Sequence, residues 1–265
     1  MKNNKIVLFD MDGTLTLPRE KIQHDMIRSL RDLSLSTKIG IVTGSDFEYV
    51  MQQCGDMFDL SGVPVNRIDI FPCNGTKHYK WANNKFNKVS EVDMIEKISS
   101  AKYKMLLQTL LSFQLMITLK HDVPYTGTFF DYRGSTLNWC PIGRSADKKE
   151  RKAWVAEDEE YKIRNYFMKE VTKFFKEKDI DLKIALGGST SFDIYPTGWD
   201  KTYVISHLAE YDNIYFVGDR CGPGGNDYEL YQMISNIFPN NSFITDSTAS
   251  TIKIIETIKK EQQNE

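Results

Sequence analysis

Two aspartates stand where the first apolar run of the chain ends. Every residue from Ile6 to Phe9 is apolar, and Asp10-Met11-Asp12-Gly13-Thr14 follows directly. A continuous apolar run is typical of a strand that a parallel sheet buries on both faces, and such sheets place their chemistry at the strands' carboxyl ends. Two carboxylates spaced two residues apart on an extended chain can face one ligand, either a divalent cation or a phosphoryl group.

A carboxylate in this place can also act as a nucleophile. It can attack phosphorus to give an aspartyl phosphate, while its neighbour moves a proton to or from the departing or attacking oxygen. A bare Asp-x-Asp would favour an ordinary acidic turn, but Asp-x-Asp-Gly-Thr after four apolar residues is more specific and favours chemistry. The string resembles the nucleophile motif of the haloacid dehalogenase-like phosphotransferases. That resemblance implies that Asp10 is phosphorylated, that Asp12 is the general acid and base, and that magnesium bridges them.

The composition is that of a globular protein without a bulk attraction to polyanions. The chain has 265 residues, of which 41% are hydrophobic and 26% are charged, and its formal net charge is -2. One large or two modest domains are expected, and binding to nucleic acid or to a membrane is not. No signal peptide or membrane-spanning run is recognised, so we expect a cytoplasmic protein. The scattered cysteines form no CxxC pair, which favours reduced thiols over a zinc site or a disulfide framework.

The segments on either side of the middle of the chain predict an α/β domain with a parallel sheet. Glu20 to Leu35 has helical spacing of its apolar residues, and Ile39 to Val42 is a second buried strand. Further strands are expected at Arg67 to Phe71 and at Asn213 to Val217, with a helix at Asp200 to Tyr211. We therefore predict an α/β core domain formed by residues 1–81 and 199–265, and the resemblance of its opening motif implies that this is a Rossmann-like haloacid dehalogenase core.

The intervening residues, 82–198, predict an inserted α+β cap domain with an antiparallel sheet. A polar hairpin around Asn83-Asn84 precedes runs of short strands, and the helices are grouped apart from them. The helices are expected at 92–111 and at 158–178, and the strands at 113–120, 128–133, 136–142, 182–186 and 191–195.

Three further groups of polar residues in the core segments fit the opening motif. The hydroxyl of Thr43 or, alternatively, that of Ser45 follows the second strand and can hydrogen-bond a phosphoryl oxygen. Lys201 lies at a helix start, where its charge opposes the helix dipole unless an anion such as Asp10 or a phosphate compensates it. The glycine-rich string from Gly218 to Asp227 would return carboxylates toward Asp10. The magnesium ligands predicted in this way are Asp10, Asp12, Asp219, Asn226 and Asp227.

The inserted segment carries the residues expected to recognise a substrate. Arginine binds phosphate oxygens bidentately and stays charged, although any single arginine is more often a solvated surface charge. Ser191 and Asp193 alternate with apolar residues and should face the same side of a strand. The predicted substrate-binding set is Arg133, Arg144, Arg151, Ser191 and Asp193 of the inserted segment, together with Arg19, which lies just past the opening motif of the core.

Taken together, several strings are similar to those of the eukaryotic phosphomannomutase family. They are Asp-Gly-Thr-Leu-Thr-x-Pro-Arg, Gly-Ser-Asp-Phe, Pro-Ile-Gly-Arg-Ser, Gly-Gly-x-x-Ser-Phe-Asp, Pro-x-Gly-Trp-Asp-Lys and Pro-Gly-Gly-Asn-Asp. The resemblance implies interconversion of mannose 6-phosphate and mannose 1-phosphate through an aspartyl phosphate and a hexose 1,6-bisphosphate. Glucose phosphates remain alternative substrates, and the product would supply GDP-mannose synthesis and glycosylation. The implied cofactors are Mg²⁺ and a hexose 1,6-bisphosphate activator, and the implied partner is a second copy of the chain, bound through the cap domain.

Two alternatives stay open at this point. A sugar-phosphate phosphatase of the same superfamily needs the same nucleophile but only one phosphate site, and a catalytically silent relative would act through binding. The arginine set argues against the first alternative, and the intact Asp10, Asp12, Lys201 and Asp219 argue against the second. The segment after Glu229 lacks the acidic residue by which relatives are thought to hold a second cation, so we predict no second cation site.

Overall fold

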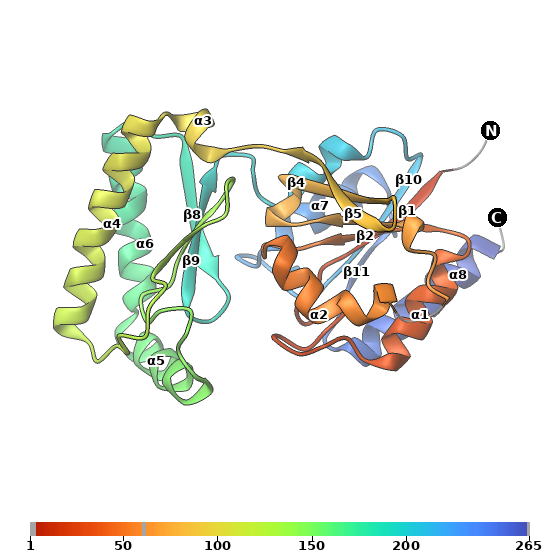
Figure 1. Cartoon of the computed structure of the whole chain (residues 1–265), viewed down its shortest axis with the longest axis horizontal. Helices are drawn as coiled ribbons and strands as arrows, with labels where there is room; N and C mark the ends of the chain where they lie inside the picture. Colours follow the sequence, from red (N-terminus) through yellow and green to blue (C-terminus); the bar gives the residue numbers. More distant parts are fainter. Residues whose placement is uncertain (1–3, 60–61, 264–265) are drawn as a thin grey trace. The chain divides into compact units, whose positions relative to one another are not determined.

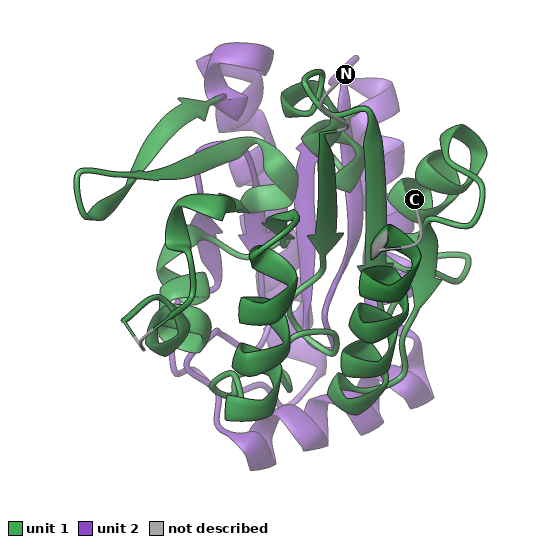
Figure 2. Cartoon of the chain, turned by 90° about the vertical axis from the view of Figure 1, so that its right-hand side faces the viewer, with its two compact units in different colours: residues 1–91, 198–265 green, residues 92–197 purple. Residues whose placement is uncertain are grey.

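The computed structural model describes residues 4–59 and 62–263, and the chain divides into two compact units (Figure 2). Unit 1 consists of residues 1–91 and 198–265, and unit 2 of residues 92–197. The hairpin that ends at Glu91 was expected to open the inserted domain at residue 82. Its second strand instead pairs with the core sheet, so unit 2 begins at Val92. Among the described residues no helix is long and apolar enough to cross a membrane.

Unit 1 is built on a seven-stranded sheet in the order β11-β10-β1-β2-β3-β4-β5. The first five strands of that order are parallel, and β4 and β5 extend the sheet as an antiparallel hairpin. The turn residues of the hairpin, Asn83 and Asn84, both have a positive φ, which suits a tight hairpin turn. The strands are β1 (Lys5–Phe9), β2 (Lys38–Val42), β3 (Ile68–Phe71), β4 (Lys77–Ala82), β5 (Lys85–Glu91), β10 (Asn213–Gly218) and β11 (Ser242–Ile244).

The apolar run of β1 is buried on both faces, as its sequence predicted. Val7 and Phe9 belong to the core cluster that contains the apolar residues of α1 (His24–Ser34), α2 (Phe47–Asp59) and α8 (Thr248–Gln263). Ile6 and Leu8 belong to a second cluster with residues of the 3₁₀ helix η3 (Lys201–His207) and α7 (Tyr228–Ile237). Alternate residues of β1 therefore pack against helices on opposite faces of the sheet, and this burial fixes the position of the carboxyl end of the strand. Figure 1 shows the helices around this sheet.

Unit 2 is a four-stranded antiparallel sheet in the order β6-β7-β9-β8, with helices packed on one face. Trp139 of β7 contacts Phe167 of α6 and donates its indole N–H to Gln114 of α4, so that this face of the sheet is the covered one. The strands are β6 (Phe130–Tyr132), β7 (Leu137–Trp139), β8 (Leu182–Gly187) and β9 (Ser191–Pro196), and the helices are α3 (Met94–Ile98), α4 (Ser100–Lys120), α5 (Lys148–Tyr161) and α6 (Ile163–Glu177).

Three predicted elements were wrong. The strand expected at 113–120 is the second half of α4, because Leu106, Leu110, Gln114 and Ile117 recur at helical spacing and are all buried. The helix expected at 158–178 is two helices, because Lys162 between them has a left-handed φ of 53°. The helix expected at Asp200 to Tyr211 is the shorter 3₁₀ helix η3, which Asp200 caps by accepting the Thr202 N–H at 3.1 Å.

Candidate active site

The carboxyl ends of β1 and β10 bring two predicted site residues together. The two strands pair in parallel with Phe9 opposite Val217, and the Asp10 N–H donates to the Val217 carbonyl at 2.9 Å. Asp10 follows the first strand directly and Asp219 follows the second. Carboxylate oxygens of Asp10, Asp219 and Asp227 all lie within 4.8 Å of one another. The clustering predicted from the order of the motifs is therefore present in the fold of unit 1.

Lys201 is the cationic partner of this cluster. Its ammonium donates to Oδ1 of Asp10 and to Oδ1 of Asp227, and its side chain is only 1% exposed. The second oxygen of Asp227 accepts the Arg220 N–H at 3.0 Å, and the residue makes no side-chain cap of α7. The side chain of Asp227 therefore points toward the cluster, and it does not cap α7 although the residue lies at the start of that helix.

The charges of the cluster do not balance. Three carboxylates face one ammonium, and Asp10 is 4% exposed. Burial raises the pKa of Asp10 to about 8, and Asp227 adds to this rise while Lys201 opposes it. Burial likewise raises the pKa of Asp219 to about 6, again with a contribution from Asp227. Burial alone would lower the pKa of Lys201, but Asp10 and Asp227 raise it, so the ammonium stays charged.

The donor set of this cluster fits a hard divalent cation. Mg²⁺ prefers a few carboxylate oxygens, and its charge would offset the excess of negative charge in the cluster. Oδ1 of Asp219 is buried and has no hydrogen-bond partner among the described residues, as expected for an atom that serves a ligand. Gly13 makes room for the same carboxylate, since a Cβ there would lie 2.8 Å from Cγ of Asp219.

The remaining predicted core residues surround the cluster to different extents. Thr43 is 3% exposed, and its hydroxyl accepts the Ser45 N–H at 3.1 Å, which fixes both residues at the end of β2. Asn226 is exposed beside the buried Asp227. The side chain of Asp12 points to α2, where it accepts hydrogen bonds from Tyr49 at 3.2 Å and Gln53 at 3.1 Å. Sequence reasoning missed Tyr49 and Gln53, although their spacing of four residues places them on one helix face.

Unit 2 presents a row of polar side chains on the sheet face opposite its helices. Asp131 of β6 pairs with Asn138 of β7, and Asn138 pairs with Asp193 of β9, so the three side chains share one face. Asn138 donates to Ser191 Oγ at 3.1 Å and to Asp193 Oδ1 at 2.7 Å. The prediction that Ser191 and Asp193 lie on one side is confirmed.

The predicted arginines of unit 2 gather around this row. Arg133 and Arg144 both contact Oδ2 of Asp131, at 3.0 and 3.4 Å. Arg144 also donates to the side-chain oxygen Oδ1 of Asn138 at 3.3 Å. Arg151 donates to the backbone carbonyls of Ala146 and Arg144 and so holds the loop that carries Arg144. Arg133 and Arg144 are therefore held beside Asp131, and Arg151 braces the loop from Arg144 to Ala146.

Asn138 is the residue of this face that sequence reasoning missed. It is 3% exposed and links the arginine side of the face to the Ser191 and Asp193 side through both ends of its amide. A polar residue between Leu137 and Trp139 in a predicted strand was the available signal, because alternation places it opposite the apolar face.

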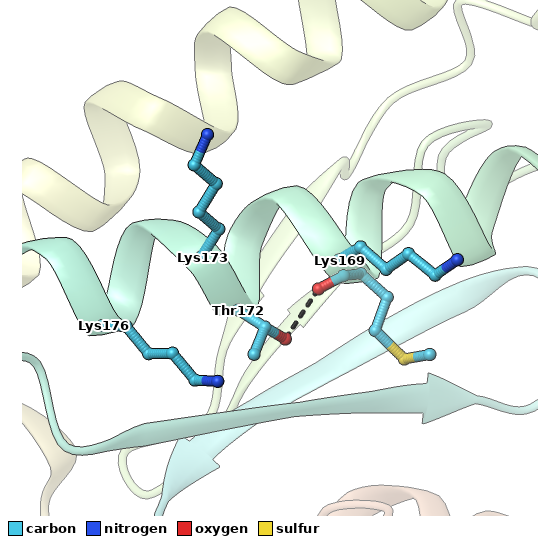
Figure 3. Close-up of a pocket in the computed structure, with 5 residues that line it drawn as sticks. Lys169, Thr172, Lys173 and Lys176 are labelled. Atoms are coloured by element: carbon cyan, nitrogen blue, oxygen red, sulfur yellow. Dashed lines mark hydrogen bonds between the residues drawn. The ribbon is translucent and has the colours of Figure 1, made fainter.

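A shallow hollow of about 340 Å³ lies on α6 and is separate from this polar face (Figure 3). Thr172 donates to the carbonyl of Met168 at 2.7 Å, and Lys173 points away from Lys169 and Lys176. Because these lysines diverge, they offer no convergent anion site. Phe167 and Val171 of the same helix are buried in unit 2, so the hollow faces away from the sheet.

Comparison with known proteins decides the family. The sequence model of "Eukaryotic phosphomannomutase" matches residues 25–260. The chain belongs to the eukaryotic phosphomannomutase family. Phosphomannomutase 2 of Dictyostelium discoideum is 35% identical over 256 residues, which cover 95% of this chain and 95% of that protein. Phosphomannomutase 1 of Mus musculus is 35% identical over 234 residues, which cover 87% of this chain and 84% of that protein.

Solved structures place this phosphomannomutase family member in the predicted fold class. An N-terminally truncated IMP-nucleotidase of Plasmodium falciparum superposes with a TM-score of 0.63 at 12% identity, over 97% of this chain and 70% of that one. A trehalose-6-phosphate phosphatase of Aspergillus fumigatus superposes with a TM-score of 0.55 at 14% identity, over 97% and 93% of the two chains. At such identities the likeness shows the fold alone, and it agrees with the predicted α/β class with a parallel sheet and an inserted α+β segment.

Proposed function

We propose that this chain interconverts mannose 6-phosphate and mannose 1-phosphate through an aspartyl phosphate and a hexose 1,6-bisphosphate. The buried Asp10, bonded to Lys201 within the carboxylate cluster, is the observation that carries the proposal. The family of the chain indicates mannose phosphates as the substrates. Glucose phosphates remain candidate substrates because they share the 6-position. The four cysteines are buried, and their scatter in the sequence favours reduced thiols and a reducing compartment, so we infer that the enzyme works in the cytoplasm.

In the proposed reaction Asp10 is the nucleophile. A carboxylate oxygen of Asp10 attacks phosphorus of the bisphosphate, a P–O bond to Asp10 forms, and the bond to the sugar oxygen breaks. Asp12 gives a proton to that departing oxygen. A mannose 6-phosphate then binds, and Asp12 takes the proton from its 1-hydroxyl as that oxygen attacks the aspartyl phosphate, which frees Asp10 and gives the 1,6-bisphosphate. After this bisphosphate has turned end for end, Asp10 attacks its 6-phosphate, Asp12 returns the proton to the 6-oxygen, and mannose 1-phosphate leaves. Lys201 and the hydroxyl of Thr43 or Ser45 bind the phosphoryl oxygens while the charge moves.

The polar face of unit 2 serves the phosphate that is not being transferred. Arg133, Arg144 and Arg151 supply the cationic groups, with Arg19 of unit 1 as a further one. Ser191 and Asp193 offer a hydroxyl and a carboxylate to the sugar hydroxyls. A mutase must bind a bisphosphate in two orientations and therefore needs this second set, whereas a phosphatase does not. We accordingly assign residues 92–197 as the substrate-recognition cap domain.

Mg²⁺ is the proposed cofactor, with a hexose 1,6-bisphosphate as activator. Asp10, Asp219, Asp227 and the backbone of Asp12 would hold the cation, with Asn226 as a further oxygen ligand. When bound, it would neutralise the developing charge on the phosphoryl oxygens. Asp10 would then be kept ionised, since a nearby cation counteracts the rise in its pKa that burial causes.

Magnesium affinity should fall as the pH is lowered from 8 to 6. Below about 8 the buried Asp10 carboxyl holds a proton that the cation must displace, so the affinity should weaken by up to about tenfold per pH unit. Without the cation the linkage has the opposite sign. A carboxyl whose pKa is raised on folding stabilises the protein as the pH falls from 8 toward 4, and the metal-free melting temperature should rise.

Isothermal titration calorimetry and thermal melting at several pH values test both statements. Asp219→Asn is the control, because it removes one ligand and should weaken magnesium binding at every pH. A magnesium affinity that does not change between pH 8 and pH 6 would contradict the proposed ligand set.

One assay separates the mutase from its alternatives. The protein is incubated with mannose 1-phosphate, Mg²⁺ and a hexose 1,6-bisphosphate, and the products are resolved. Mannose 6-phosphate supports the proposal, whereas free phosphate in its place would identify a sugar-phosphate phosphatase. If neither product forms, the catalytically silent alternative, a binding role, is supported. A parallel run with glucose 1-phosphate ranks the two sugars.

A second copy of the chain is the proposed protein partner. Leu111, Leu115 and Leu119 of α4 recur every four residues and are 56, 59 and 76% exposed, so unit 2 carries an apolar stripe on its outer surface. Leu115→Glu should weaken the dimer by about 10²-fold or more, because it puts a charge into a stripe that the proposed dimer would bury. Sedimentation velocity measures this, with Leu35→Glu as the matched control on α1's flank in unit 1. Equal dimer content in Leu115→Glu and wild type would exclude this stripe as the interface.

A further inference from the structure

One face of α2 is bonded along its length to the loop that follows β1. Tyr49, Gln53 and Asp56 share this face at spacings of four and three residues. The Gln53 carbonyl accepts the Ile22 N–H at 2.9 Å, and Asp56 forms an ion pair with Lys21 at 2.9 Å. The helix thereby holds the loop from Asp12 to Ile22 at several points.

Two further contacts of α2 converge on a single oxygen of Asp12. The Tyr49 hydroxyl donates to Oδ1 at 3.2 Å, and the Gln53 amide donates to the same Oδ1 at 3.1 Å. Across residues 4–59 and 62–263, Oδ2 of Asp12 accepts no hydrogen bond from a protein group. The carboxylate is therefore held by one oxygen, and its other oxygen is left for a ligand.

The Gln53 amide is itself held in one orientation. Thr16 donates its hydroxyl to Gln53 Oε1, and Gln53 is 3% exposed. Its Nε2 consequently faces Asp12, and the amide cannot be turned over without breaking both bonds. Gln53 supplies the rigid donor to Asp12.

Tyr49 differs from Gln53 because its donor is a titratable hydroxyl. Burial and the charge of Asp12 raise the pKa of Tyr49 to about 12, while the charge of Arg19 opposes the rise, so the hydroxyl keeps the proton that it donates to Asp12. Arg19 lies in the exposed loop and has a φ of 66°, a left-handed conformation that a non-glycine residue rarely adopts without support. The charge of this residue, which the proposed function uses for phosphate binding, acts on the hydroxyl that holds Asp12.

We propose that Tyr49 is a positioning residue that, together with Gln53, holds Asp12 by Oδ1 and so presents Oδ2 to the oxygen exchanging its proton. The inference rests on the proposed function in one respect, namely that Asp12 is the general acid and base. It adds a residue that neither binds the phosphoryl group nor touches the transferred proton.

Acetyl phosphate separates the steps that need Asp12 from the step that does not. In the first step a carboxylate oxygen of Asp10 attacks phosphorus and acetate leaves as a stable anion, so no proton has to be supplied. In the second step the oxygen of water attacks phosphorus, the bond to Asp10 breaks, and the proton of water passes to Asp12 Oδ2. Single-turnover measurements with the magnesium-loaded full chain give both rates.

Tyr49→Phe should slow the second step by about tenfold, a part of the 10²- to 10⁴-fold that general acid–base catalysis contributes. Its rate of phosphorylation by acetyl phosphate should stay within about twofold of wild type, since that step needs no proton transfer. In the mutase assay kcat should fall by a similar factor with little change in KM. Tyr79→Phe is the matched control, because it removes the same atom from a partly buried tyrosine that stacks on Phe47.

An unchanged decay rate in Tyr49→Phe would overturn the inference, and so would an equal slowing of both steps, which would indicate a general structural role. A wild-type protein that forms and loses the phosphoenzyme but makes no mannose 6-phosphate would refute the proposed mutase while leaving the decay measurement to judge Tyr49. A wild-type protein that forms no phosphoenzyme would remove both.

Discussion

Asp10→Asn will form no phosphoenzyme, and its mutase activity will fall by about 10³-fold or more. The amide that replaces the carboxylate is not a nucleophile toward phosphorus, so the covalent route is closed. The fold should survive, because the amide has nearly the shape of the carboxylate and Lys201 keeps Asp227 as a partner. Acid-quenched labelling with a radioactive sugar 1,6-bisphosphate measures the phosphoenzyme, and circular dichroism checks the fold.

Asp12→Asn provides the contrast to this variant. It keeps the nucleophile and loses the proton carrier, so it should accept a phosphoryl group from acetyl phosphate but transfer it poorly to a sugar or to water. A base-labile phosphoenzyme that persists in Asp10→Asn would remove Asp10 from the nucleophile role. Loss of labelling in both variants would show that the two aspartates do not have separate roles.

Lys201→Met will lower the free energy of unfolding of the metal-free protein by about 3–5 kcal/mol, the usual cost of leaving buried charges unpaired. The ammonium is 1% exposed and is the cation that Asp10 and Asp227 share. Methionine fills most of the same volume but supplies no charge. Saturating Mg²⁺ should restore part of the loss, because the cation would replace the missing positive charge. Urea denaturation with and without magnesium measures both effects.

Lys77→Met is the matched control for this substitution. Lys77 also pairs with two carboxylates, Asp46 at 3.1 Å and Glu91 at 3.6 Å, but these are partly exposed, so the loss should be about 1 kcal/mol or less. The double variant Lys201→Met with Asp227→Asn should lose less stability than the sum of the two single variants, since each removes a partner of the other. A loss in Lys201→Met no larger than that in Lys77→Met would contradict the charge balance described for the cluster.

The features that the sequence predicts well are those whose cause is local. The apolar run from Ile6 to Phe9 reports burial on both faces, and the alternation around Ser191 and Asp193 reports one polar face, because each pattern follows directly from strand geometry. The turn at Asn83-Asn84 is readable for the same reason, since asparagine tolerates a positive φ.

The features that escaped prediction have causes distant in the chain. The residues from Phe113 to Lys120 have the composition of a strand, but burial of Gln114 and Ile117 on one helix face extends α4 through them. The role of Asn138 depends on its neighbours across the strands, and that of Tyr49 depends on its contact with Asp12, more than thirty positions earlier in the chain. Such pairings depend on tertiary structure, which no local pattern encodes.

The interruption of unit 1 by residues 92–197 sets the order in which the molecule can be completed during translation. β1 lies between β2 and β10, and β10 leaves the ribosome more than a hundred residues after β3. Unit 2 is a continuous segment and can fold first. The first part of unit 1 leaves one edge of β1 without a neighbouring strand until β10 has been synthesised. Asp10 gains Lys201, Asp219 and Asp227 as neighbours only when the second part of unit 1 has been synthesised and has folded. A nascent or truncated chain therefore has a nucleophile motif but no reaction centre.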